Sequence, residues 1–120
     1  MQSLLLLNFD DRPFDADVIE LVFRSSGKFQ DIRLNEPGGA LVEADYVENG
    51  DRTTAALSAS RKSIWLSGTS NAALRAALIL QSHFAQSLRM VDTEYSFDFR
   101  LSEFATVEEL IAAIENAPAD

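Results

Sequence analysis

Four short stretches with the composition of β-strands follow one another between residues 29 and 66, and this succession constrains the fold more than any other feature. Only turn residues separate these stretches, which cover residues 29–34, 40–47, 52–59 and 63–66. Asn49-Gly50 stands between the second and the third, and both residues tolerate the positive φ angles of a type I′ hairpin turn. Strands joined by such short connections pair antiparallel, so the sequence predicts a meander.

Three amphipathic segments predict helices on either side of this meander, over residues 16–26, 72–86 and 107–115. Asp15 is placed to cap the first of them, and Gly27 is placed to end it in a left-handed conformation. Thr106 and Glu109 have the spacing of a capping box at the start of the last helix.

Three further apolar stretches predict strands over residues 4–9, 88–91 and 95–100. The first is almost continuously apolar, which indicates a central strand that is buried on both faces. In the last, Tyr95, Phe97 and Phe99 alternate with polar residues and are expected to face the core together.

The resulting order is β-α-β-β-β-β-α-β-β-α, with more consecutive strands than helices between them. This order predicts an α+β fold with a largely antiparallel sheet and helices packed on it. A chain of 120 residues has the size of one compact domain, which we expect to span residues 1–120 with a frayed tail at 117–120.

Composition excludes several classes of function. The chain has no cysteine, so disulfides, thiolate metal sites and cysteine nucleophiles are excluded. The leucine run at residues 4–7 has no basic residue before it and is too short for a signal peptide or a membrane span, so we expect a cytoplasmic protein. The net charge of −9 disfavours nucleic acid and anionic membranes as partners. It either serves solubility alone or steers a basic partner toward the protein.

Few residues are candidates for catalysis or ligand binding, and each of them has an ordinary structural interpretation. His83 is the only histidine and has no metal-binding motif around it, so we expect a partly buried or exposed helix residue. The segment 67–70 is expected to cap the following helix, with anion binding as the weaker alternative. Trp65, between Ile64 and Leu66, is expected in the core. We therefore predict no catalytic residue, no metal site and no cofactor, and expect that the protein is not an enzyme.

Acidic residues are the candidates for binding a protein partner, namely Asp10, Asp11, Asp15, Glu43, Asp45 and Glu48. Glu43 and Asp45 are two residues apart on a predicted strand, which places both carboxylates on one face about 7 Å apart. A solvated surface is the alternative for all six residues, with helix capping in addition for Asp15. An acid–base pair or a hard-cation site at Glu43 and Asp45 would need a third anchor, which the sequence does not offer.

Three features spread along this acidic chain carry a resemblance to a known class of proteins. They are the end of the meander at residues 63–68, the Ala-rich helix, and residues 92–98 leading into 106–110. With them, the chain resembles the small immunity proteins of bacterial contact-dependent growth inhibition and polymorphic-toxin systems. The resemblance implies a protein that binds and neutralises one cognate toxin domain, often a basic nuclease, and it carries over no functional residue.

Three other functions stay open beside this interpretation. The chain could be an accessory or chaperone-like protein of a secretion system. It could also be a small enzyme or ligand-binding domain, which would be marked by a deep cleft with convergent polar groups. A subunit of a homo-oligomer would be marked by an exposed apolar patch or an unpaired strand edge.

Overall fold

The computed structural model of the chain describes residues 3–10, 12–35 and 39–116. The strands within them are β1 (Ser3–Asn8), β2 (Gln30–Leu34), β3 (Val42–Glu48), β4 (Asp51–Leu57), β5 (Ile64–Ser67), β6 (Leu88–Asp92) and β7 (Asp98–Arg100). The helices are α1 (Ala16–Ser25), α2 (Asn71–Ser82), α3 (Val107–Glu115) and a short 3₁₀-helix η1 (Leu101–Glu103). The predicted tail at 117–120 lies outside the described residues.

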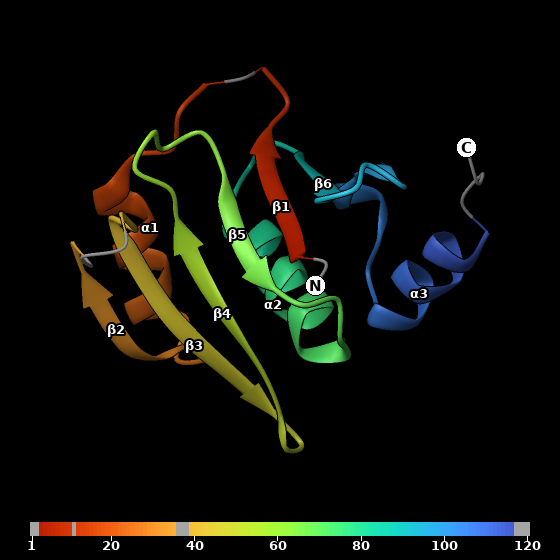
Figure 1. Cartoon of the computed structure of the whole chain (residues 1–120), viewed down its shortest axis with the longest axis horizontal. Coiled ribbons are helices and arrows are strands. Elements are labelled where there is room, and N and C mark those ends of the chain that lie inside the picture. The colour runs from red at the N-terminus through yellow and green to blue at the C-terminus, as the bar shows by residue number, and fades with distance from the viewer. Residues whose placement is uncertain (1–2, 11, 36–38, 117–120) are drawn as a thin grey trace.

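The seven strands form one sheet in the order β2-β3-β4-β5-β1-β6-β7, in which every neighbouring pair is antiparallel. The predicted α+β fold with an antiparallel sheet is therefore confirmed. Strands β2 to β5 make the predicted meander, and β1 then joins this meander to β6 and β7 (Figure 1). The first strand of the chain thus occupies an interior position in the sheet.

Several local signals in the sequence act as expected. The Asp15 side chain accepts a backbone N–H from the first turn of α1, and Gly27 follows that helix with a φ of 68°. The turn between β3 and β4 has positive φ at both Asn49 (49°) and Gly50 (81°). Both reciprocal hydrogen bonds of the capping box form at residues 106–109.

The helices cover only one face of the sheet, which corrects the expectation for β1. In Figure 1, α1 and α2 lie behind the strands. Leu4 and Leu6 point to this covered side and are fully buried, whereas Leu5 and Leu7 point the other way and are only half-buried. The prediction that β1 is buried on both faces is wrong. The uncovered side, which carries Leu5, Leu7, Trp65 and the side chains in register with them, is called the open face below.

Helix α2 ends at Ser82 instead of continuing to residue 86. The Gln81 amide nitrogen donates to the carbonyl oxygens of Phe84 (3.4 Å) and Gln86 (2.9 Å), and its amide oxygen accepts the N–H of Leu88 (2.7 Å). One side chain thereby replaces the hydrogen bonds of another helical turn, and it directs the chain into β6.

The aromatic stretch at residues 95–100 also departs from its prediction. The buried Asp92 side chain accepts the backbone N–H of Ser96 (2.7 Å) and its hydroxyl, which forms a turn before β7. Tyr95 lies in this turn with a φ of 54° and is 66% exposed. Phe97 and Phe99 do stack on each other, with ring centroids 4.9 Å apart. The expectation that Tyr95 joins them in the core is wrong.

Candidate functional site: the open face of the sheet

The strand register places one residue from every strand in a row across the open face. From β2 to β7 the row reads Arg33, Glu43, Ala56, Trp65, Leu5, Val91 and Asp98. Both ends of the row are charged and its centre is apolar. The open face therefore has three parts: a charged flank on β2–β4, an apolar centre on β5 and β1, and a second charged flank at β6 and β7; Val91 of β6 lies in the same row but is fully buried.

Trp65, at the centre of this row, is 43% exposed. The expectation that it belongs to the core is wrong, because its neighbours Ile64 and Leu66 are fully buried on the covered side and alternation turns Trp65 outward. A signal for this orientation exists in the sequence, since Ser63, Trp65 and Ser67 alternate with the two aliphatic residues. The expectation of a buried Trp65 followed instead the usual preference of tryptophan for burial.

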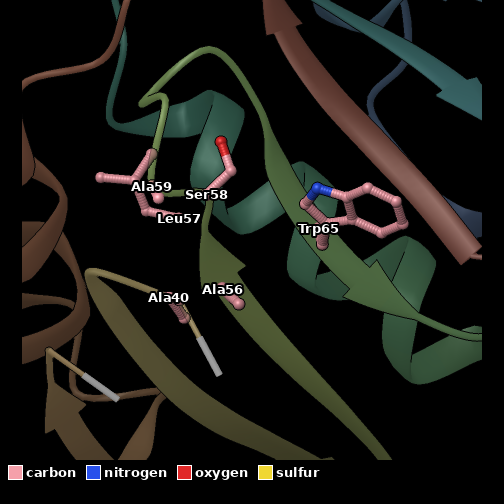
Figure 2. A pocket seen from close by; sticks show the side chains of 7 residues that line it. Ala40, Ala56, Leu57, Ser58, Ala59 and Trp65 are labelled. Carbon is pink, nitrogen blue, oxygen red and sulfur yellow. The ribbon is translucent and has the colours of Figure 1, made fainter. Parts of the chain in front are cut away.

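A hollow of about 280 Å³ lies beside Trp65. Its lining is made of small or apolar residues, namely Gly39, Ala40, Ala56, Leu57, Ser58, Ala59 and Trp65. In Figure 2 the indole ring extends from β5 toward β1, where Leu5 is its direct cross-strand neighbour. An exposed tryptophan next to such a hollow gives the centre of the open face both a projecting group and a recess.

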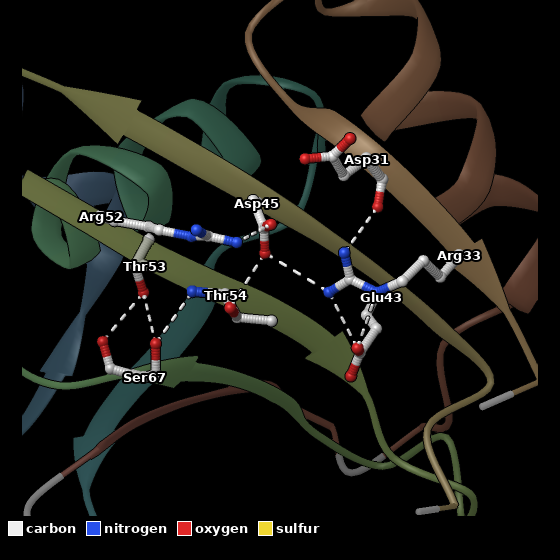
Figure 3. A network of polar contacts seen from close by, with 8 residues as sticks. All are labelled: Asp31, Arg33, Glu43, Asp45, Arg52, Thr53, Thr54 and Ser67. Atoms are coloured by element: carbon white, nitrogen blue, oxygen red, sulfur yellow. Dashed lines mark hydrogen bonds and ion pairs between the residues drawn. The ribbon is translucent and has the colours of Figure 1, made fainter. Parts of the chain in front are cut away.

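The flank on β2–β4 is an ion-pair network around Asp45 (Figure 3). Arg33 donates to Glu43 (Nε–Oε1 3.0 Å, Nη2–Oε1 2.8 Å) and to Asp45 (Nη2–Oδ1 3.3 Å). Arg52 contacts the other oxygen of Asp45, and the Thr54 hydroxyl donates to Oδ1 at 3.0 Å. The Asp45 side chain has no exposed surface, whereas those of Arg33 and Arg52 are 33% and 63% exposed.

The electrostatics of this network keep Asp45 ionised. Burial raises the pKa of its carboxyl group, but the hydrogen bonds from Arg33, Thr54 and Arg52 outweigh burial and hold the pKa below its usual value. The hydrogen bonds of Arg33 to Asp45 and then to Glu43 raise the pKa of its guanidinium group. The Asp45 carboxylate is thus held by the neighbouring strands, whereas the guanidinium groups of Arg33 and Arg52 and the Glu43 carboxylate all reach solvent in part.

The second charged flank is an ion pair in which the carboxylate is the more exposed partner, because the side chain of Asp98 is 48% exposed and that of Arg89 30%. Arg89 pairs with Asp98 across β6 and β7, with Nε 3.2 Å from Oδ1. The guanidinium of Arg100 lies over the ring of Phe9, 4.2 Å from its centroid, in a cation–π contact. Phe9 follows β1 and is 44% exposed, so it extends the apolar centre of the open face toward this flank.

The structure does not gather the six predicted acidic residues into one patch. Asp10 pairs with Arg12 at 2.9 Å, and Asp15 caps α1. Glu48 accepts hydrogen bonds from the Tyr46 hydroxyl (2.9 Å) and from Arg75 (3.1 Å). Glu43 and Asp45 belong to the network on the open face, and Asp11 lies outside the described residues. The loop that follows β1 and the β3–β4 hairpin lie at opposite ends of the sheet (Figure 1).

A second hollow, of about 330 Å³, includes His83 in its lining. The polar groups around it serve the local structure: Asn8 donates to the carbonyl oxygen of Arg12 (2.9 Å), and the Asp15 side chain caps α1. His83 itself is exposed at the C-terminal end of α2, within the range expected from the sequence. Among the residues that the structure describes, no three His, Asp or Glu side chains come together as a set of metal ligands.

Asp51 has a role that the sequence did not reveal. Ser70 is the N-cap residue of α2, but its side chain makes no capping hydrogen bond to the helix. Instead, Asp51 at the start of β4 accepts the N–H of Ala72 at 3.0 Å. This hydrogen bond, and a second one with the Ser70 side chain, lower the pKa of Asp51. A carboxylate of the protein therefore occupies the helix end at which an anion would bind.

No family model, curated protein or solved structure matches this chain. Within the described ranges, no helix combines the length and the apolar character that crossing a membrane requires. The chemistry of the open face itself is therefore the basis for a functional proposal. It offers an apolar centre with Trp65 and a hollow, between two flanks whose carboxylates are engaged by arginines.

Proposed function

We propose that this protein works by binding another protein through the open face of its sheet. The partner, as the sequence resemblance implies, is a toxin domain that the bound protein inhibits. The observation that carries the proposal is the 43% exposure of Trp65 at the centre of the open face. Tryptophan is enriched among the residues that dominate binding energy, and such residues lie near the centre of an interface within a ring of weaker contacts.

The dimensions of the molecule suit this role. A standard interface takes about 800 Å² from each partner, and the chain exposes 6564 Å² in total. One face of the sheet can therefore supply the area of a standard interface. Because the strands fix the backbone of the open face, little backbone freedom would be lost on binding.

The use of the polar groups on this face favours binding over catalysis. A catalytic site needs a nucleophile or base that can reach a substrate. Here the Asp45 carboxylate is enclosed by Arg33 and Arg52, and the Thr54 hydroxyl donates to it. These groups hold one another in place, which makes the network a rigid flank for a docking surface.

The test compares Trp65→Ala with Leu21→Ala, a control that is 64% exposed and belongs to α1, which lies on the opposite side of the sheet from the open face (Figure 1). Domains encoded next to this gene are expressed alone and together with each variant, and bacterial growth and affinity are measured. We expect the wild type and Leu21→Ala to restore growth in the presence of one such domain. Trp65→Ala should weaken binding by about 30-fold, or roughly 2 kcal/mol.

Two results would contradict the proposal. Equal affinity of the wild type and Trp65→Ala would show that the open face is not the docking surface. If the wild-type protein neither binds nor neutralises any toxic domain encoded next to its gene, the inhibitory role is contradicted. Circular dichroism of both variants checks that each is folded, which we expect because both side chains are substantially exposed.

A further inference from the structure

We infer that the hollow beside Trp65 binds one uncharged aromatic side chain of the partner, and that an oxygen atom of the partner accepts a hydrogen bond from the indole N–H. This inference rests on the proposed function and specifies which groups of the partner enter the open face. It follows from the size of the hollow, from the use of the polar groups in its lining and from the indole nitrogen.

The hollow exists because small side chains lie next to a large one. Ala56 on β4 is the direct cross-strand neighbour of Trp65 on β5, and both belong to the open face. Ser58 is the next residue of the chain that points outward after Ala56, so the small side chains continue past the end of β4. A closed apolar cavity of about 150 Å³ is large enough to hold benzene. The hollow, at about 280 Å³, therefore has room for one aromatic ring.

The polar groups in the lining are already used by the fold. Among the described residues that line the hollow, none is charged, and Ser58 has the only hydroxyl. That hydroxyl lies 3.1 Å from the hydroxyl of Ser60 and accepts the backbone N–H of Ser63 at 3.4 Å. The carbonyl oxygen of Leu57 accepts the N–H of Leu41 at 3.0 Å. Moving a charged group from water into such a lining is unfavourable, whereas burying an apolar ring is favourable.

The indole N–H of Trp65 is a donor that the fold leaves to solvent. In Figure 2 the nitrogen lies on the β4 side of the indole, while the six-membered ring extends toward β1. Within the described part of the chain, no group accepts a hydrogen bond from this N–H. Water can accept it in the free protein, but a partner that covers the ring excludes water. Because a buried donor without an acceptor is unfavourable, the covering group has to supply an oxygen atom. A tyrosine, or a phenylalanine beside a free backbone carbonyl, meets both requirements.

The experiment uses Trp65 as its own reporter, because the only tryptophan of the chain gives the only indole signal in a ¹⁵N–¹H correlation spectrum. Two small probes of similar shape are compared. N,N-dimethylbenzamide is an uncharged ring with a carbonyl acceptor, and N,N-dimethylbenzylamine is a cation at neutral pH. We expect the amide to shift the indole signal downfield and saturably, with a dissociation constant on the order of 1–10 mM. The amine should bind more weakly by about threefold or more.

Two changes to the protein locate the bound probe. Ala56→Leu fills the hollow and should weaken binding of the amide by about threefold or more, whereas Ala112→Leu, at an exposed position of α3, should leave it unchanged. Expression with benzothienylalanine in place of tryptophan changes residue 65 alone and removes its N–H. The affinity for the amide, followed through the backbone signal of Ala56, should then fall by about threefold.

Absence of a saturable shift with the amide, or tighter binding of the amine, would overturn the inference. An unchanged affinity in the benzothienyl protein would refute the hydrogen bond. A wild-type dimer that Ala56→Leu dissociates would place a second copy in the hollow and overturn the assignment to a partner. The probes need no partner, so they separate the two proposals. Binding of the amide together with unchanged partner affinity in Trp65→Ala would reject the proposed function. Loss of partner binding in Trp65→Ala without binding of the amide would keep the docking surface and reject the aromatic contact.

Discussion

At the scale of single residues, Asp45 shows how the open face tolerates a charge withdrawn from water. An unpaired buried carboxylate is strongly unfavourable. Here two guanidinium groups and one hydroxyl hydrogen-bond to it, and no hydrogen-bonding side-chain atom that is buried in the described part of the chain lacks a partner. The arginines, in contrast, retain access to water. The buried Asp45 carboxylate therefore needs its arginine partners more than the arginines need the carboxylate.

This asymmetry predicts that Arg33→Gln destabilises the fold more than Asp45→Asn. Loss of Arg33 leaves a buried carboxylate with Arg52 and Thr54 only, which should cost about 2–3 kcal/mol. Asp45→Asn removes the buried charge and lets both arginines turn to water, which should cost about 1 kcal/mol. Urea unfolding at pH 7 measures both differences, and the reverse order would contradict this account of the network.

Tyr46 allows a second test at this scale. Burial, and then its hydrogen bond to Glu48, raise the pKa of Tyr46 to about 12. In a Tyr95→Phe variant it is the only tyrosine left, because the chain has two. We expect its absorbance at 295 nm to titrate with a midpoint near pH 12. A midpoint near the ordinary value of 10.0 would show that the hydroxyl is open to solvent.

The sign for stability follows from the same shift in Tyr46. The folded pKa is higher than the unfolded one, so the contribution of this group is complete below pH 10 and is lost as the pH rises through about 12. Tyr46→Phe should therefore remove part of the decrease in stability at alkaline pH. Urea midpoints for the wild type and Tyr46→Phe between pH 9 and 11 measure this difference, and parallel curves would argue against it.

At the scale of elements, the contact of Asp51 with α2 couples a hairpin to a helix that begins 20 residues later. Asp51→Ala should leave the first turn of α2 without its acceptor and lower the Tm by about 4–8 °C. Asp51→Asn keeps an acceptor and should lose less at pH 7. Thermal unfolding followed by circular dichroism compares the three proteins, and an unchanged Tm in Asp51→Ala would show that the cap is dispensable.

The pH dependence of Asp51 has the opposite sign to that of Tyr46. Its pKa in the folded protein lies below the usual 3.8, so its contribution is present above that pH and is lost as the pH falls further. Asp51→Asn should therefore flatten the decrease of Tm between pH 4 and pH 2.5. Identical slopes for this variant and the wild type would assign acid sensitivity to other carboxylates.

Elements whose signals are local were predictable from the sequence, and those that depend on distant side chains were not. Asn49-Gly50 and the capping box at residues 106–109 act within a few residues, and both are observed. The early end of α2 depends on the Gln81 side chain reaching residue 88, and the turn before β7 depends on Asp92. Such contacts compete with helix and strand propensity only after the chain has folded back on itself.

At the scale of the whole molecule, the two faces of one strand should respond differently to the same substitution. Leu6 is fully buried beneath the helices, whereas its neighbour Leu5 lies on the open face beside Trp65. Leu6→Ala should destabilise the fold by about 2–5 kcal/mol through loss of packing and creation of a cavity. Leu5→Ala should cost about 1 kcal/mol or less and weaken partner binding instead. Equal losses of stability in urea would show that the open face is part of the core.

The candidate site was only partly predictable from the sequence. Alternation correctly placed Glu43 and Asp45 on one side of a strand. It could not show that Arg33 lies across from Glu43, because that pairing depends on the register between β2 and β3, where a bulge shifts the alignment. The same limit explains why carboxylates that were expected to be available to a partner are instead held by arginines of neighbouring strands.

The interior position of β1 has a consequence for synthesis of the protein. This strand is translated before the other six, yet it pairs with Ile64–Leu66 and with Leu88–Asp92, which are translated much later. Closing such long loops costs entropy before any contact compensates for it, so non-local pairing of this kind is slow. The leucine run of the nascent chain therefore stays without both of its partner strands until residues 64–67 and then 88–92 have been made, a period in which chaperones can bind it.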